Sequence, residues 1–382
     1  MAILSCSTEF PLDPGIIYLN HAGVAPWPAR TAEAVRMFAA ENLRYGAAHY
    51  PAWMQVEKRL REQLRGLINA PSGDDIALLK NTSEGISLVA AGLSWQPGDN
   101  VVISDQEFPS NRMAWEALAG RGVVTRCVSL AGDDPEAALI ARLDARTRVL
   151  AISAVQFATG LRLDLPRLGA ACRANGTLFC VDAIQQVGAL RFDVQASHAD
   201  FAIADGHKWL LGPEGVALFY ATPKARDALT LTQYGWHMAE HAGDYNRTDW
   251  TPAKSARRFE CGSPNMLGIH ALSASLSLLE EIGMAHVEAQ VLANTGYLAR
   301  GIAALPGWSL ISRREEKFCS GIITARHASG AHAAIFRRLK DDGVICAERG
   351  GGIRLSPHFW LTDAQLNRAM ELLEKAGKNC RL

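Results

Sequence analysis

Short runs of apolar residues recur through the first two thirds of the chain, and most of them do not alternate with polar residues. Continuous apolar runs of this length are typical of strands that are buried on both faces of a sheet. Seven strands are predicted in this way, at residues 76–80, 100–104, 123–129, 148–154, 178–182, 201–204 and 216–220. Helical patterns separate several of them, at residues 85–93, 111–119, 135–143 and 165–174. This alternation predicts an α/β fold with a large domain, in which helices sandwich a mainly parallel seven-stranded sheet.

The remainder of the chain predicts a smaller C-terminal α/β domain. A helical tract over residues 268–305 would lead into a strand near 321–324, a helix near 333–340 and strands at 344–347 and 353–356. The last helix would begin at Thr362, where the spacing matches a capping box. We expect a large domain over residues 15–265 and a small one over 266–382, with residues 1–14 packed on the small domain or on a partner subunit. Residues 234–258 lack periodicity and are predicted to form a loop.

Charge and composition then exclude several classes of protein. The 382 residues carry 39 Lys and Arg against 39 Asp and Glu, so the basic excess of a nucleic-acid-binding protein is missing. A hydrophobic content of 48% argues against disorder, and no apolar run is long enough to span a membrane. The eight cysteines are scattered without a Cys-x-x-Cys pair, and no signal peptide is recognisable. We therefore expect a cytoplasmic protein without nucleic-acid or membrane partners.

Polar residues of unusual chemistry follow three of the predicted strands, where open α/β sheets bind ligands. Thr82 and Ser83 open a helix and could hold a phosphate, although Thr82 could also be only an N-cap. Asp182 ends an apolar strand, where a carboxylate is costly unless it meets a cation, or it caps the next helix. Lys208 lies in a Gly-rich segment, either as a surface residue or as a buried amine with a lowered pKa. Together these residues meet the needs of pyridoxal phosphate (PLP): a lysine, an acid for the pyridine nitrogen and a phosphate cradle.

These segments resemble the class V aminotransferase family of fold-type I PLP enzymes. The resemblance is to the branch that includes cysteine desulfurases, selenocysteine lyases, kynureninases and isopenicillin N epimerase, and it extends over nearly the whole chain. The strongest segment is Asp205-Gly206-His207-Lys208 followed by Gly212-Pro213-Glu214-Gly215, which is similar to the cofactor-lysine segment of the family. The segment Arg258-Phe259-Glu260-Cys261-Gly262-Ser263-Pro264-Asn265 is similar to a second family segment.

The resemblance implies a role for each of several residues. Lys208 would bind PLP covalently and act as the base, Asp182 would hold the pyridine nitrogen protonated, and Gln185 would contact the ring substituents. Phe108 would stack on the ring. The phosphate would be bound by Thr82, Ser83 and His207, and by Gly262 and Ser263 of the partner subunit in a homodimer with shared active sites. An amino-acid substrate would be bound by Asn20, His21, Arg349 and Arg354, with one of the arginines clamping its carboxylate.

Three positions depart from the pattern of the desulfurases. Phe108 stands where these enzymes generally have a histidine, and Asp205 where a small residue is usual. Cys346 precedes the arginines inside a predicted strand, so we interpret it as a buried apolar residue and not as the nucleophile of a mobile loop. The predicted function is therefore an amino-acid lyase of the C–S type, or an aminotransferase, without a catalytic cysteine. The alternatives are an epimerase of the isopenicillin N epimerase type, a persulfide-forming desulfurase and a non-catalytic PLP-binding protein.

The segment His237-Met238-Ala239-Glu240-His241 matches the H-x-x-E-H pattern of one group of zinc peptidases. Two histidines at this spacing share a metal only on a helix, whereas Gly235 and Gly243 flank the segment and favour a loop. No metal site is predicted on this basis. Trp236 and His237 are instead candidates for substrate contacts in a loop beside the PLP pocket.

Overall fold

The computed structural model describes residues 8–378, and at its centre lies a seven-stranded sheet. In spatial order the strands are β2 (Ile76–Leu79), β8 (Ala217–Ala221), β7 (Phe201–Asp205), β6 (Leu178–Asp182), β5 (Thr147–Ser153), β3 (Asn100–Ser104) and β4 (Val124–Val128). Among these seven, β8 alone runs opposite to the other six strands. The predicted mainly parallel sheet is confirmed, and every predicted strand overlaps an observed one.

Both faces of this sheet are buried, which explains the unbroken apolar runs. Successive residues of β5 enter different cores: Leu150 and Ile152 pack into one, and Val149 and Ala151 into the other. The first core also receives side chains of α3 (Tyr50–Leu67), α7 (Leu165–Asn175) and α9 (Met266–Ile282). The second receives α4 (Thr82–Gly92) and α5 (Ser110–Glu116). The short helices α6 (Pro135–Ile140) and α8 (Pro223–Asp227) complete this region.

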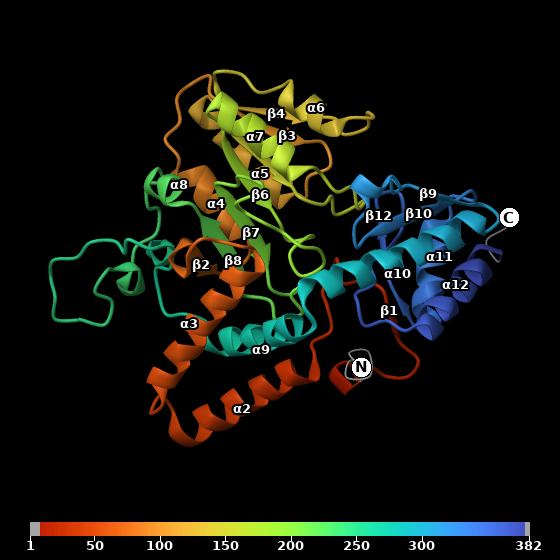
Figure 1. Cartoon of the computed structure of the whole chain (residues 1–382), viewed down its shortest axis with the longest axis horizontal. Helices are drawn as coiled ribbons and strands as arrows, with labels where there is room; N and C mark the ends of the chain where they lie inside the picture. The colour runs from red at the N-terminus through yellow and green to blue at the C-terminus, as the bar shows by residue number, and fades with distance from the viewer. Residues whose placement is uncertain (1–7, 379–382) are drawn as a thin grey trace.

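The long helices differ from the prediction in two ways. The tract at 268–305 is two helices, α9 and α10 (Met284–Ala304), because Gly283 between them has a φ of 83° and interrupts the helical path. Two helices near the N-terminus, α2 (Ala29–Tyr45) and α3, were not predicted, and both pack against α9. Figure 1 shows α10 running from this helical group to the C-terminal part of the chain.

The smaller C-terminal unit is built on a four-stranded antiparallel sheet in the order β12 (Ala347–Arg349), β13 (Gly352–Leu355), β10 (Ile323–His327) and β9 (Trp308–Leu310). Helices α11 (His332–Asp341) and α12 (Asp363–Lys378) pack together beside it. The predicted strand at 344–347 is split at Cys346, because β11 (Val344–Ile345) pairs with β1 (Ile17–Tyr18) in a separate sheet. β9 was not predicted.

The two ends of the chain and the loop at 234–258 lie around this framework. Phe10 stacks on Trp360 with ring centroids 4.5 Å apart, while residues 1–7 of the predicted N-terminal segment lie outside the described residues. The loop contains short 3-10 turns at Trp236–Met238 and Ala256–Phe259, and it projects on the side away from the C-terminal unit (Figure 1). Among the described residues, no helix is both long and apolar enough to cross a membrane.

Gly85 allows α4 to lie close to the sheet, and this contact can be tested. A Cβ atom at Gly85 would lie 2.9 Å from Ile203 Cγ2 and 3.2 Å from Phe219 Cδ2, whereas a Cβ at Gly66 of α3 would meet nothing within 4 Å. We expect Gly85→Ala to lower the free energy of unfolding by about 1–3 kcal/mol through overpacking. Gly66→Ala should raise it by about 0.5–1 kcal/mol through helix propensity. Urea denaturation measures both, and equal effects of the two substitutions would contradict the close contact.

Candidate active site

A cavity of about 350 Å³ lies at the carboxyl ends of the central strands. Ser153, Asp182 and Asp205 are the last residues of β5, β6 and β7, and the parallel register aligns Ser153 with Asp182. Because carboxyl ends of parallel strands meet at one edge, the sheet brings these polar residues together. The cavity is lined by Ala22, Gly23, Val24, Asn81, Thr82, Ser83, Phe108, Ser110, Ser153, Phe157, Asp182, Ile184, Gln185, Asp205, His207, Lys208, Arg349 and Arg354.

Lys208 and Asp182 are both buried in this cavity. Burial lowers the pKa of the Lys208 amine to about 8, although the charge of Asp182 opposes this shift. Burial also raises the pKa of Asp182 to about 7, against the backbone N–H of Ile184 and the charge of Lys208. In each case the low-dielectric surroundings disfavour the charged form. The site therefore holds an amine that can lose its proton near neutral pH, beside a carboxyl group that needs a cationic partner to stay ionised.

The N-terminus of α4 forms one end of the cavity. Asn81 is the N-cap, because its side chain accepts a hydrogen bond of 2.9 Å from Glu84 N. The alternative in which Thr82 serves only as the N-cap is therefore excluded. Thr82 Oγ1 is instead buried without a hydrogen-bond partner, and Ser83 Oγ lies 2.7 Å from Ser110 Oγ. Hydroxyls beside the free N–H groups of a helix N-terminus form a site for an anion such as a phosphate.

His207 and Asp205 lie at the same cavity as a pair. The His207 Nδ1 atom is 3.0 Å from Asp205 Oδ1. The two atoms are within ion-pair distance but form no hydrogen bond with each other.

Two phenylalanines form the aromatic part of the wall. Phe108 and Phe157 make a T-shaped contact with centroids 5.2 Å apart, and Lys208 Nζ lies 5.6 Å from the centroid of the Phe108 ring. Phe108 is 42% exposed, so part of its ring remains available to another planar group.

Arg354 is a buried cation without an anionic partner among the described residues. Its Nη1 donates to the Phe157 carbonyl at 2.9 Å and its Nη2 to Asn20 Oδ1 at 3.1 Å, while its Nε is buried without a partner. Burial lowers the pKa of Arg354 to about 10, with a further contribution from the charge of Arg349. Arg349 is exposed and bonds only to the carbonyl of Glu348 in the described part of the chain. Both arginines reach the cavity, as a carboxylate clamp requires.

Several predicted site residues lie elsewhere. Asn20 does not line the cavity, but it accepts hydrogen bonds from two lining residues, Gly23 and Arg354. His21 is fully buried behind the wall, where its Nδ1 bonds the carbonyl of Ser356 and its ring contacts Trp209 and His358. Gly262 and Ser263 line a separate cavity, so their roles toward the partner subunit remain predictions. Gln185 lines the site, but Ala22 O and Trp209 Nε1 already engage its amide.

The proposed contacts of the 234–258 loop need correction. Neither Trp236 nor His237 lines the Lys208 cavity of its own chain. Trp236 borders a cavity of about 440 Å³ within the loop itself. His237 is buried, and it lies beside Glu57 of α3 and beside Glu260.

Glu107 is a site residue that the sequence did not reveal. Its carboxylate is buried and accepts hydrogen bonds from Ser104, Asn111, Gln156 and both the N–H and the hydroxyl of Ser153. These bonds fix the backbone that carries Phe108 next to the end of β5. A single glutamate in a polar turn gives no signal of such burial, because two of its donors, Ser153 and Gln156, are distant in the sequence.

The cysteines lie away from the reaction centre. None of the six cysteines in the described part of the chain lines the cavity. Cys346 is 6% exposed, and burial raises the pKa of its thiol to about 12. It is the buried residue that was predicted.

The comparison with known families identifies the family of the chain. The model of the family named aminotransferase class-V matches residues 17–359. The chain belongs to this family. It is an enzyme, and members of the family use PLP as cofactor. Among curated relatives, a probable cysteine desulfurase of Methanothermobacter thermautotrophicus is 28% identical over 96% of both chains. The isopenicillin N epimerase of Streptomyces clavuligerus is 29% identical over 95% of both. A cysteine desulfurase of Pectobacterium carotovorum is 32% identical over 83% of this chain and 74% of its own length.

Solved structures of the family share the fold. The cystine C–S lyase C-DES, in complex with cysteine persulfide, matches with a TM-score of 0.89 and 24% identity over 96% of this chain and 99% of its own. A cysteine desulfurase of Escherichia coli matches with a TM-score of 0.88 and 22% identity over 99% and 98%. The architecture is therefore that of the fold-type I PLP enzymes, as predicted.

The cavity of this aminotransferase class-V member fits PLP. The orphaned Thr82 hydroxyl and the α4 N-terminus suit its phosphate. The buried Asp182 would gain the cationic partner that it lacks from the pyridine nitrogen. Lys208 would supply an amine for its aldehyde, and the exposed part of Phe108 suits its ring.

Asp182 makes the stability of the cofactor-free enzyme depend on pH. Because burial raises the folded-state pKa of this carboxyl to about 7, its contribution to stability is fully present below its unfolded pKa of about 4 and is lost as pH rises to about 7. We expect the melting temperature of wild type relative to Asp182→Asn to fall between pH 4 and pH 7 and to stay constant above it. Thermal melts of both proteins without PLP test this. A difference that is independent of pH would contradict the buried titration.

Proposed function

We propose that this PLP-dependent enzyme is an amino-acid lyase that breaks a Cβ–S bond by elimination, without a catalytic cysteine. The observation that carries the proposal is the convergence of Lys208 and Arg354 on one cavity that no cysteine of the described chain lines. The cavity thus offers a base and a carboxylate-binding cation but no thiol to accept sulfur.

The residues would divide the work as follows. When bound, PLP withdraws electrons from the Cα atom of an amino acid attached to it, which acidifies the Cα proton. The Lys208 amine, with its pKa near 8, would accept that proton and return it later. Asp182 would keep the proton on the pyridine nitrogen. Arg354 would bind the substrate carboxylate, which supplies the anion that this buried guanidinium lacks.

The C-terminal hairpin argues against a persulfide-forming mechanism. Arg349 of β12 pairs with Gly352 of β13, so that only Gly350 and Gly351 form the turn, with φ values of 60° and 77°. A two-residue turn of this type is tight, and a Cβ at Gly350 would lie 2.9 Å from the Ala158 carbonyl. No mobile cysteine-bearing loop connects these two strands.

Elimination is also favoured over epimerisation. Opposite-face reprotonation needs a second acid across the substrate from Lys208. The titratable residues on the described cavity wall are Asp182, Asp205, His207, Lys208, Arg349 and Arg354. Of these, Asp205 and His207 face one another, the arginines remain charged and Asp182 is assigned to the pyridine nitrogen, which leaves Lys208 as the proton carrier. The phenylalanine wall, Phe108 and Phe157, suits a poorly hydrated sulfur leaving group, and the names of several relatives support a sulfur amino acid as substrate.

Lys208→Ala tests the covalent attachment of the cofactor. We expect purified wild type to be yellow, and Lys208→Ala to lose the visible band and to retain no PLP adduct after borohydride reduction and mass spectrometry. The reason is that removal of the amine removes the nucleophile for the aldehyde. Lys80→Ala, which changes a lysine outside the cavity, should keep the band. A reduced adduct at another lysine of wild type would contradict the assignment.

An amino-acid panel tests the reaction. With cysteine, cystine and related β-sulfur amino acids, we expect ammonia and a keto acid to form in equal amounts without an added acceptor, together with a sulfur product. Arg354→Gln should lower kcat/KM by about 10–1000-fold, since a charge-assisted bond to the carboxylate is worth about 1.5–3 kcal/mol and more in a buried site. Keto acid that forms only with an amino-group acceptor would indicate transamination, and inverted amino acid would indicate an epimerase. Either result would overturn the lyase proposal.

A further inference from the structure

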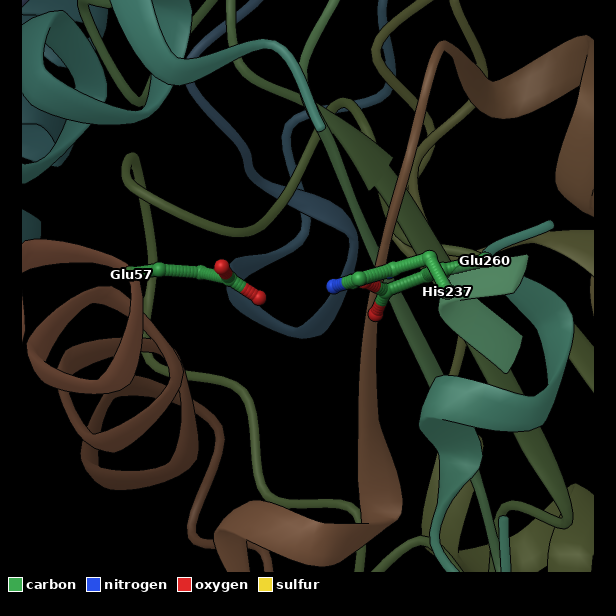
Figure 2. A group of neighbouring side chains, drawn as sticks. All are labelled: Glu57, His237 and Glu260. Atoms are coloured by element: carbon green, nitrogen blue, oxygen red, sulfur yellow. The ribbon is translucent and has the colours of Figure 1, made fainter. Parts of the chain in front are cut away.

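A second group of buried polar side chains lies outside the Lys208 cavity, where α3 meets the segment at 234–262. Glu57 and Arg61 come from α3, His237 from the first 3-10 turn of the loop, and Glu260 from the residue after the second turn. Glu57, His237 and Glu260 are each at least 94% buried. Figure 2 shows a ring nitrogen of His237 facing the Glu57 carboxylate across a gap, with Glu260 beside His237.

The hydrogen bonds of this group leave two atoms unsatisfied. Arg61 donates to Glu57 Oε1 at 2.5 Å and to both oxygens of Glu260 at 2.6 and 2.8 Å. Leu78 N also donates to Glu260 Oε1. Glu57 Oε2 and His237 Nδ1 remain buried without a hydrogen-bond partner. The 3.7 Å between His237 Nδ1 and Glu260 Oε2 is too long for a hydrogen bond. Two buried orphan atoms at one place are costly unless something binds between them.

We propose that Glu57, His237 and Glu260 bind a divalent metal ion of the zinc type. Imidazole nitrogens and carboxylate oxygens are both ligands that zinc takes in proteins. One potential ligand atom from each residue lies within 4.8 Å of the others, and atoms bound to one zinc ion at about 2.0–2.2 Å lie within about 4.3 Å of each other. Small side-chain movements therefore close the site. The ion satisfies both orphan atoms.

Arg61 is compatible with such an ion because it leaves lone pairs free on the carboxylate oxygens of Glu57 and Glu260. It binds Oε1 of Glu57 and leaves Oε2 without a partner, and Glu260 Oε2 accepts only one bond from the described residues. Arg61 then serves as an outer-shell group that orients both carboxylates. The ion would hold the segment at 234–262 against the surface of α3. This segment ends at Gly262, and Ser263 follows it directly.

The H-x-x-E-H pattern contributes only its first histidine to this site. His241 is exposed, and Glu240 accepts a hydrogen bond from Lys254 N. The two other ligands lie far away in the sequence, and the fold brings them together. This arrangement also provides a matched control, because His241 is a histidine of the same loop that does not belong to the site.

Zinc titration of the full-length, PLP-loaded enzyme tests the proposal after chelator treatment and removal of excess PLP. We expect wild type and His241→Ala to bind one more equivalent of zinc than His237→Ala, as measured by calorimetry and elemental analysis. Zinc should also raise the melting temperature of the first two proteins but not of His237→Ala. The visible cofactor band should stay unchanged in all three, which separates this result from the fate of the proposed reaction.

Glu57→Gln is the second variant, since its amide oxygen can keep the bond to Arg61 while the orphan carboxylate oxygen is lost. It should lose the same equivalent of zinc, and it keeps the proposal testable if His237→Ala does not fold. Zinc bound at surface thiols would be present in wild type and in every variant, so it does not affect the difference in bound equivalents between them. Equal zinc binding by wild type, His237→Ala and Glu57→Gln, or no binding by any of them, would overturn the proposal. A buried water molecule would then be the occupant of the gap.

Discussion

The desolvation of Lys208 and Asp182 at one edge of the sheet is the constraint on which the active site depends. Neither group is well solvated, and burial moves the pKa of each toward neutrality. Such an arrangement is unfavourable for an empty protein and favourable for one that holds a ligand with a cationic ring nitrogen, an aldehyde and a phosphate. The parallel sheet holds the two groups close together. β6 ends at Asp182 and pairs with β7, which leads into the segment that carries Lys208. The unfavourable free energy of burying these two groups would thus be offset when the cofactor binds. The same burial lowers the pKa of Lys208, so that its amine could act as a base near neutral pH.

The sheet and the cofactor residues could be predicted from the sequence because both leave local signals. A strand buried on both faces is an unbroken apolar run, and a polar residue directly after it, such as Asp182, is conspicuous. The failures have equally physical causes. α2 buries only Thr31 and leaves Met37 and Leu43 exposed, so it shows no apolar periodicity. α3 could have been predicted from the sequence, because its buried residues Trp53, Leu60 and Leu64 occur at helical spacing. Glu107 could not be predicted, because its partners Ser153 and Gln156 are distant in the sequence and meet it only in the folded chain.

The site at Glu57, His237 and Glu260 also shows that a local sequence pattern cannot identify residues that meet only in the folded chain. A pattern such as H-x-x-E-H assumes that the ligands come from one helix, and the loop at 234–258 breaks that assumption. The histidine that matters is identified by burial and by its neighbours on α3, neither of which is visible in a local pattern. Single-sequence motifs therefore lose most of their value where a metal would join separate segments, and buried unsatisfied atoms become the better guide.

The short turn between β12 and β13 connects the fold to the outcome of the reaction. Gly350 and Gly351 adopt left-handed conformations that hold Arg349 and Arg354 on adjacent antiparallel strands. A longer connection would be mobile enough to carry a nucleophile to the cofactor and away again. The tight turn gives up that mobility and keeps Arg354 fixed against Phe157 and Asn20. Under the proposed lyase function, a cavity with one proton carrier, one fixed cation and no thiol on the described wall offers released sulfur no acceptor on that wall. The sulfur would then leave with the product, which is the difference between a lyase and a persulfide-forming desulfurase.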